Sequence, residues 1–196
     1  MKKIISLILA LLMVFSLCAC KSQGENGEIE TIVDNFFKSI QKYDMKEFDS
    51  FFYDTDEIKA AKIIDSRTPQ YSYLKEKAKE MTYKIQNVKI NSSEAEVEVL
   101  CSYYDMTSVY STMMLKAFEL VSDGADISVT GEEFDKLVKK AFDQALASNP
   151  PKKENKEITL TLNNKDGKWY IKGSIEIADV VTGNLAKTLS GLAKEN

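Results

Sequence analysis

Histidine is absent from this 196-residue sequence. The chain therefore lacks Ser-His and Cys-His nucleophile pairs, imidazole-ligated zinc sites and the side chain that most readily acts as a general base near neutral pH. No Gly-rich loop of the phosphate-binding type occurs, and a single cysteine beyond position 20 cannot build a thiolate zinc site. We therefore predict no metal or organic cofactor.

Arginine is almost absent as well, since Arg67 is the sole example. The formal net charge is −4, and it would become −6, with 24 basic against 30 acidic residues, if a leader containing Lys2 and Lys3 were removed. Acidic and basic residues are interspersed, as on a solvated surface. Because nucleic-acid-binding surfaces concentrate basic side chains to neutralise phosphates, we expect no nucleic-acid partner.

What the chain does contain at its start is the layout of a secretory signal. Lys2 and Lys3 precede an apolar run over 4–17 that two serines interrupt, and small residues follow. The run is too short to span a hydrocarbon core of about 30 Å, which needs about 20 apolar residues. We therefore interpret it as a leader and not as a transmembrane helix.

The end of this leader, Leu17-Cys18-Ala19-Cys20, resembles the lipoprotein box of Gram-positive bacterial lipoproteins. The resemblance implies that residues 1–19 are a signal peptide and that the Cys20 thiol receives a diacylglyceryl group carrying fatty acids such as palmitate. Two acyl chains hold a protein on a membrane durably, whereas one binds only marginally. The expected location is the outer face of the cytoplasmic membrane, with the membrane contacted through the lipid. An ordinary cleavable signal that releases a secreted protein is the alternative.

Residues 20–27 then form the lipidated cysteine and a polar, flexible tether, and residues 28–196 form a single domain. Cys101 is the only cysteine in that domain, so it has no internal disulfide. Because Cys101 lies on the apolar face of an alternating run, we interpret it as a small buried hydrophobic residue, with a reactive thiol as the alternative.

The first part of the domain has helical periodicity. Ile29, Val33, Phe36 and Ile40 form one apolar stripe, Asp44 is suited to cap a second helix, and short helices are expected near 55–64 and 73–81. Helical spacing returns over 107–122 and 132–148, where Thr130 to Glu133 read as a capping box and Asn149-Pro150-Pro151 as a stop. A single C-terminal helix is expected over 177–192.

Period-two alternation predicts strands between these helices. Residues 83–90 and 95–104 form one hairpin, with a bulge near Gln86-Asn87, and 158–162 and 168–172 form a second around a loop at 163–167. The predicted class is α+β: an antiparallel sheet of at least four strands from two hairpins. N-terminal helices cover it, a helical insertion separates the hairpins, and a helix closes the chain.

Two segments resemble the nuclear-transport-factor-2-like, or cystatin-like, superfamily: the opening 32–37 with 43–48, and the closing strand 165–171. Small lipoproteins of unknown function carry such domains. The resemblance implies a curved sheet packed on helices, but the superfamily includes enzymes, binding modules and assembly domains, so it fixes no activity. The insertion over roughly 107–148 departs from the superfamily's pattern.

A cluster of aromatic and methionine residues is the candidate pocket, because such side chains line apolar ligand sites that carry hydroxyl groups. Its members are Tyr103, Tyr104, Asp105, Tyr110, Met113 and Trp169. Packing in the core is the alternative for all of them.

We predict a non-enzymatic module that binds a small apolar ligand or an envelope protein. One alternative is a pocket enzyme with Asp105 as base and Tyr103 or Tyr104 as proton donor. Another is a substrate-binding lipoprotein of a transporter, although that class usually needs two lobes.

Overall fold

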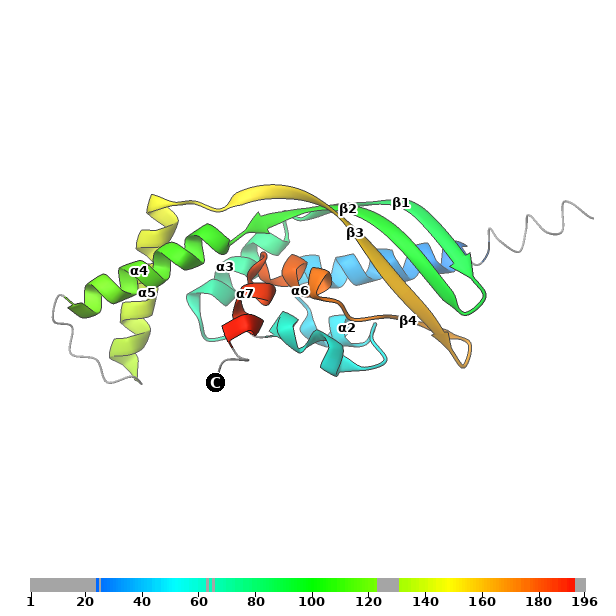
Figure 1. Ribbon diagram of the computed structural model, residues 1–196, viewed down its shortest axis with the longest axis horizontal. Coiled ribbons are helices and arrows are strands. Elements are labelled where there is room, and N and C mark those ends of the chain that lie inside the picture. Colours follow the sequence, from blue (N-terminus) through cyan, green and yellow to red (C-terminus); the bar gives the residue numbers. More distant parts are fainter. Residues whose placement is uncertain (1–23, 25, 63, 65, 123–130, 193–196) are drawn as a thin grey trace, which may run out of the picture.

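The computed structural model describes residues 24, 26–62, 64, 66–122 and 131–192. The leader, Cys20 and most of the tether lie outside these residues, so lipid attachment stays a prediction. The predicted α+β class is confirmed: a four-stranded antiparallel sheet arches over a layer of helices (Figure 1).

The sheet is a meander with the order β1-β2-β3-β4. Its strands are β1 Thr82–Asn91, β2 Glu94–Asp105, β3 Lys152–Lys165 and β4 Lys168–Ile171. The two predicted hairpins are present, and β2 also pairs with β3 along its whole length, from Glu94 opposite Asn163 to Asp105 opposite Lys152. The β2–β3 ladder joins the two hairpins into one sheet.

Local irregularities in the strands follow the sequence. The register of β1 against β2 shifts between Ile85 and Asn87, which confirms the predicted bulge. The second hairpin is tighter than predicted, because the strands continue to Lys165 and Lys168. Asp166 and Gly167, with φ of 54° and 81°, form a two-residue turn of the kind that matches strand twist.

The helices that precede the sheet occupy 26–42, α2 Met45–Asp49, the 3₁₀ segment η1 Thr55–Lys62 and α3 Pro69–Ala78. Asp44 caps α2 as predicted, because its carboxylate accepts from the amides of Lys46 at 3.1 Å and Glu47 at 2.9 Å. Helix α3 begins four residues earlier than predicted. Thr68 caps it and Pro69 takes the first position, where a missing N–H costs nothing.

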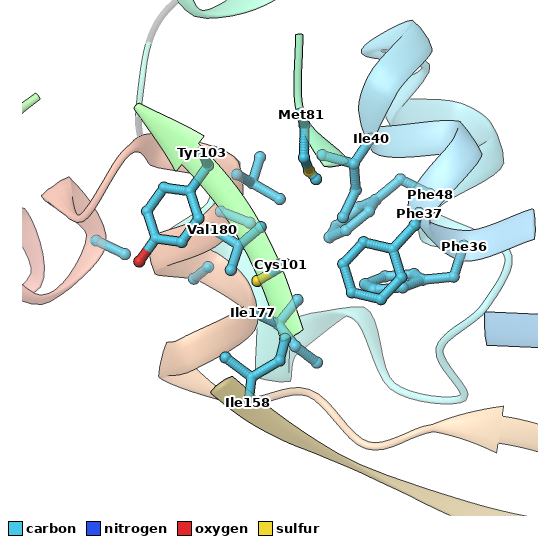
Figure 2. Packing of buried hydrophobic residues seen from close by; sticks show 14 of the residues in the cluster. Phe36, Phe37, Ile40, Phe48, Met81, Cys101, Tyr103, Ile158, Ile177 and Val180 are labelled. Atoms are coloured by element: carbon cyan, nitrogen blue, oxygen red, sulfur yellow. The ribbon is translucent and has the colours of Figure 1, made fainter. Parts of the chain in front are cut away.

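The core lies between the helices and the inner face of the sheet. Phe36, Phe37 and Phe48 are fully buried, and Cys101 and Tyr103 of β2 point into the same cluster (Figure 2). Alternate β2 residues, including Glu94 and Glu96, face solvent, so only one face of the sheet is covered.

The predicted insertion is a helical arm made of α4 Thr107–Ser122 and α5 Glu132–Ser148, which pack on each other and project from one end of the molecule (Figure 1). The capping-box prediction is wrong in its N-cap position, which Gly131 occupies. Thr130 itself lies outside the described residues. Helix α5 ends at Ser148, before the two prolines, as predicted.

The prediction of one C-terminal helix is wrong as well. The segment contains α6 Ile175–Thr182 and α7 Leu185–Leu192, separated by Gly183 and Asn184, which we call the elbow. Both elbow residues are left-handed, with φ of 66° and 65°. The amide of Met106 donates to the Gly183 carbonyl at 2.9 Å, so the elbow is attached to the end of β2.

Candidate binding site

Tyr103 and Asp105, two of the predicted pocket residues, hold the elbow in place. The Tyr103 hydroxyl donates to Asn184 Oδ1 at 2.7 Å, and Asn184 Nδ2 donates to Asp105 Oδ2 at 2.8 Å. Burial alone would raise the pKa of Asp105, but hydrogen bonds from Thr107 and Asn184 outweigh it and leave that pKa below its ordinary value. A carboxylate held in this way is a weak base, so its contacts fit a structural role.

Tyr104 has its hydroxyl engaged elsewhere. It donates to Glu80 Oε2 at 2.6 Å, and this hydrogen bond raises the pKa of Tyr104. Lys77 Nζ lies 4.8 Å from the centroid of the Tyr104 ring, within the range of a cation–π contact. Tyr104 therefore connects β2 to the end of α3.

A hollow beside Tyr103 and Tyr104 measures about 20 Å³. That volume holds about one water molecule. An enzyme that used Asp105 as base and these tyrosines as donors would have no room for an organic substrate at this place.

The other predicted pocket residues are spread over the molecule. Tyr110 and Met113 lie on α4, where Met113 is buried and its sulfur accepts from Gln70 Nε2 at 2.7 Å. Trp169 is buried on β4, opposite Asn164, at the far end of the sheet from the last residues of β2. The structure therefore brings Tyr103 and Asp105 together at Asn184, while the Tyr104 hydroxyl bonds to Glu80 and Trp169 lies apart.

Cys101 is buried and free. Burial raises the pKa of its thiol to about 11, with its Sγ 3.4 Å from the Lys156 carbonyl oxygen. A thiol in this environment is hardly ionised near neutral pH, so its position agrees with the interpretation as a small core residue.

A groove with a volume of about 1070 Å³ lies between α3 and α5. Its apolar lining comes from one side of each helix, and the residues are Pro69 and Tyr73 of α3 and Phe134, Val138, Phe142 and Leu146 of α5. Charged side chains of both signs, among them Glu76, Asp135 and Lys139, surround this lining. The groove combines an apolar floor with a polar rim, as sites that bind protein segments do.

The local sequence explains why this groove stays open. Helix α5 has 17 residues and α3 has 10, so α3 covers part of the α5 stripe and leaves the rest accessible. Phe142 is buried and contacts the edge of the Tyr73 ring at 5.9 Å, whereas Phe134 and Val138 are half-buried. Helical spacing over 132–148 predicted the helix but not the groove beside it. The signal was the unequal length of the helices.

Helix α4 exposes a second apolar surface. Met114, Leu115, Phe118 and Val121 are 53%, 66%, 71% and 39% exposed. Helix α4 packs against α5, and these four side chains lie on a face of α4 that stays exposed. Large apolar side chains grouped on one helix face commonly mark a contact surface.

Among the residues that the structure describes, no helix is both long and apolar enough to cross a membrane. The same residues contain no cluster of three or more cysteine or carboxylate side chains suited to a metal ion. No protein-family model, curated protein or solved structure matches this chain.

Proposed function

We propose that this chain is a lipid-anchored extracytoplasmic module whose groove between α3 and α5 binds an amphipathic helical segment of another envelope protein. The leader and Cys20 support the location, and the groove supports the binding function. The groove is the single observation that carries the proposal, because it is about 1070 Å³ in volume and lined by apolar side chains, whereas the hollow beside Tyr103 and Tyr104 measures about 20 Å³.

The geometry of the floor favours a helical segment. Phe134, Val138 and Phe142 are four residues apart, so they form a row along α5. An amphipathic helix laid beside this row would place residues at i, i+4 and i+7 against it, which is a common mode of helix recognition. A small apolar ligand fits less well, since such ligands bury most of their surface and this groove is open along one side.

The arrangement of the molecule is consistent with a tether at the N-terminus. The N-terminal helix begins at one end of the molecule, and the arm with the groove lies at the opposite end (Figure 1). An anchor that precedes this helix would let the groove face away from the membrane, toward proteins of the envelope.

The transporter-associated alternative has less support, because the described residues share one sheet and one core and offer no pair of lobes. The pocket-enzyme alternative lacks a cavity beside its tyrosines.

Site-specific photocrosslinking in intact cells tests the binding proposal. A benzophenone amino acid at Val138, on the groove floor, is compared with the same residue at Lys84, which is exposed on the outer face of the sheet. We expect one discrete adduct with another envelope protein at Val138 and none at Lys84. Phe142→Asp, which places a charge in the floor, should abolish that adduct while circular dichroism shows a folded protein.

Equal labelling at both positions, or an adduct that survives Phe142→Asp, would mean that the groove is not the binding surface. Phe134→Asp provides a second floor variant at a half-buried position, where loss of folding is less of a concern.

A further inference from the structure

The first half of β3 has a free edge. Strand β4 pairs only with residues from Leu162 to Lys165, and one further hydrogen bond runs from the Lys172 amide to the Thr161 carbonyl at 2.8 Å. From there back to Lys152, β3 has β2 on one side and no strand on the other within the described part of the chain. Figure 1 shows this part of β3 running along the border of the sheet.

The direction of the free backbone groups follows from the alternation of antiparallel hydrogen bonds. The Asn164 amide donates toward β2, to the Ser93 carbonyl, whereas the Thr161 carbonyl faces away from β2. The N–H and C=O groups of successive residues alternate in direction along a strand. The backbone groups of odd-numbered β3 residues therefore point away from β2, toward the free edge. The outward residues of the free edge are Lys153, Asn155, Glu157 and Thr159, and all four side chains are exposed.

The other long edge of the sheet is protected. Strand β1 contains the bulge at Ile85 to Asn87, and its exposed Lys84 and Lys89 carry charge of one sign. Bulges and lysines are the usual devices that keep an edge from pairing with a second strand. The free edge of β3 has no register shift against β2, and its lysines are interspersed with glutamates.

The order of those charges is self-complementary. The sequence is Lys153-Glu154-Asn155-Lys156-Glu157. In an antiparallel pair of two copies centred on Asn155, Lys153 faces Glu157 of the other copy, and Glu154 faces Lys156. A slide of two residues in either direction would place Glu154 opposite Glu154 or Lys156 opposite Lys156, where like charges repel.

We propose that two copies of this chain pair antiparallel through the free edges of β3, with Asn155 at the two-fold axis. Lys153, Asn155 and Glu157 then form hydrogen-bonded pairs with the second copy, and each pair exchanges two backbone hydrogen bonds. The ladder ends where Thr159 meets Pro151 of the second copy, because proline has no N–H to donate. The two-fold arrangement uses the same edge of both copies, so it closes as a dimer.

This proposal is independent of the groove, since it uses a different part of the molecule. Disulfide trapping in cell membranes that contain the full chain tests it. In the proposed register the two Asn155 Cα atoms lie about 5.5 Å apart, within the range that a disulfide spans. We expect Asn155→Cys to form a covalent dimer under mild oxidation, well above the background of the unsubstituted chain.

Thr159→Cys is the matched control, because it lies on the same strand and the same exposed face. In the proposed dimer its two copies are separated by eight strand positions, or roughly 27 Å, so they cannot form a disulfide. Equal dimer yields from the two variants, or linkage of Asn155→Cys mainly to a different polypeptide, would overturn the proposal. The second result would assign the edge to an extended segment of a partner.

A charge exchange tests the register. Lys153→Glu or Glu157→Lys alone replaces two attractive pairs by two repulsive ones and should weaken dimerisation about tenfold. The double variant Lys153→Glu with Glu157→Lys restores attraction and should recover the dimer, measured by light scattering on the purified chain in detergent. Failure of the double variant to recover would exclude this register, and a monomeric unsubstituted chain would exclude the dimer.

Discussion

Substitution of Gly183 by alanine should destabilise the fold more than the same change at Gly24, Gly27, Gly131 or Gly167, where a Cβ atom would meet no atom within 4 Å. Gly183 has φ of +66°, and a Cβ atom there would lie 2.6 Å from the Tyr104 carbonyl oxygen and 2.7 Å from Met106 Cγ. The first neighbour is backbone of a central strand, so it cannot move aside without disturbing β2 and the contact between Met106 and the elbow.

The magnitude follows from two effects. The left-handed conformation costs an alanine about 1 kcal/mol. Forcing an extra methyl into a packed site costs about 1–3 kcal/mol more. The free energy of unfolding should therefore fall by about 2–4 kcal/mol, which is a large part of the 5–15 kcal/mol typical of a domain.

Gly167→Ala separates these two effects. Gly167 also has a positive φ, of +81°, but no atom lies within 4 Å of the Cβ position. The free energy of unfolding of this variant should fall by about 1 kcal/mol, because only the left-handed conformation is unfavourable for alanine there. Urea unfolding followed by the fluorescence of Trp169, the single tryptophan, measures both variants.

A similar loss of unfolding free energy in the two variants would show that Gly183 does not stay close to the Tyr104 carbonyl oxygen in solution. An unchanged free energy in Gly183→Ala would show in addition that α6 and α7 do not break at this position. A lower stability of Gly167→Ala than of Gly183→Ala would contradict the whole assignment of the close contact.

Three further predictions concern single side chains. Cys20→Ser should move the protein from the membrane fraction to the medium, because no acyl chains would then be attached; retention in the membrane, measured by fractionation and immunoblotting, would argue against the lipid anchor. The pKa of Asp105 is lowered in the folded state, so its contribution to stability is present above the pKa of the unfolded state and is lost as the pH falls through the folded value. In urea titrations between pH 6 and 2, the stability difference between the unsubstituted chain and Asp105→Asn should shrink toward acid, and a difference independent of pH would refute this. The Cys101 thiol should react with iodoacetamide only after unfolding, because it is 1% exposed and burial raises its pKa to about 11; mass spectrometry that finds rapid alkylation of the native protein would contradict its burial.

Local patterns predicted the elements of the fold well where the physical cause was itself local. Alternation over 95–104 revealed which face of β2 is buried, and the change of parity after Ile85 revealed the bulge. The stop at Asn149-Pro150-Pro151 needed only the missing amide of proline. Each of these features depends on neighbouring residues in the sequence.

Features that depend on distant contacts were not predictable. The break at Gly183 within the predicted helix 177–192 depends on Tyr104 and Met106, which lie about eighty residues away in the sequence. The groove is formed by α3 and α5, and the unequal lengths of the two helices do not by themselves show which stretch of α5 stays uncovered. Tyr103 and Asp105 were predicted to line a pocket, and in the structure their side chains hydrogen-bond to Asn184 of the elbow.

The attachment of the helical arm has a consequence for how this protein can change. Asp105 and Lys152, the residues that flank the arm, face each other as the last pair of the β2–β3 ladder. The arm is thus inserted at the closed end of what would otherwise be a simple hairpin, and its length has no effect on the strand register. Changes in the outer part of the arm can therefore leave the strand pairing intact, whereas Met113 and Phe142, which contact α3, connect its inner part to the core.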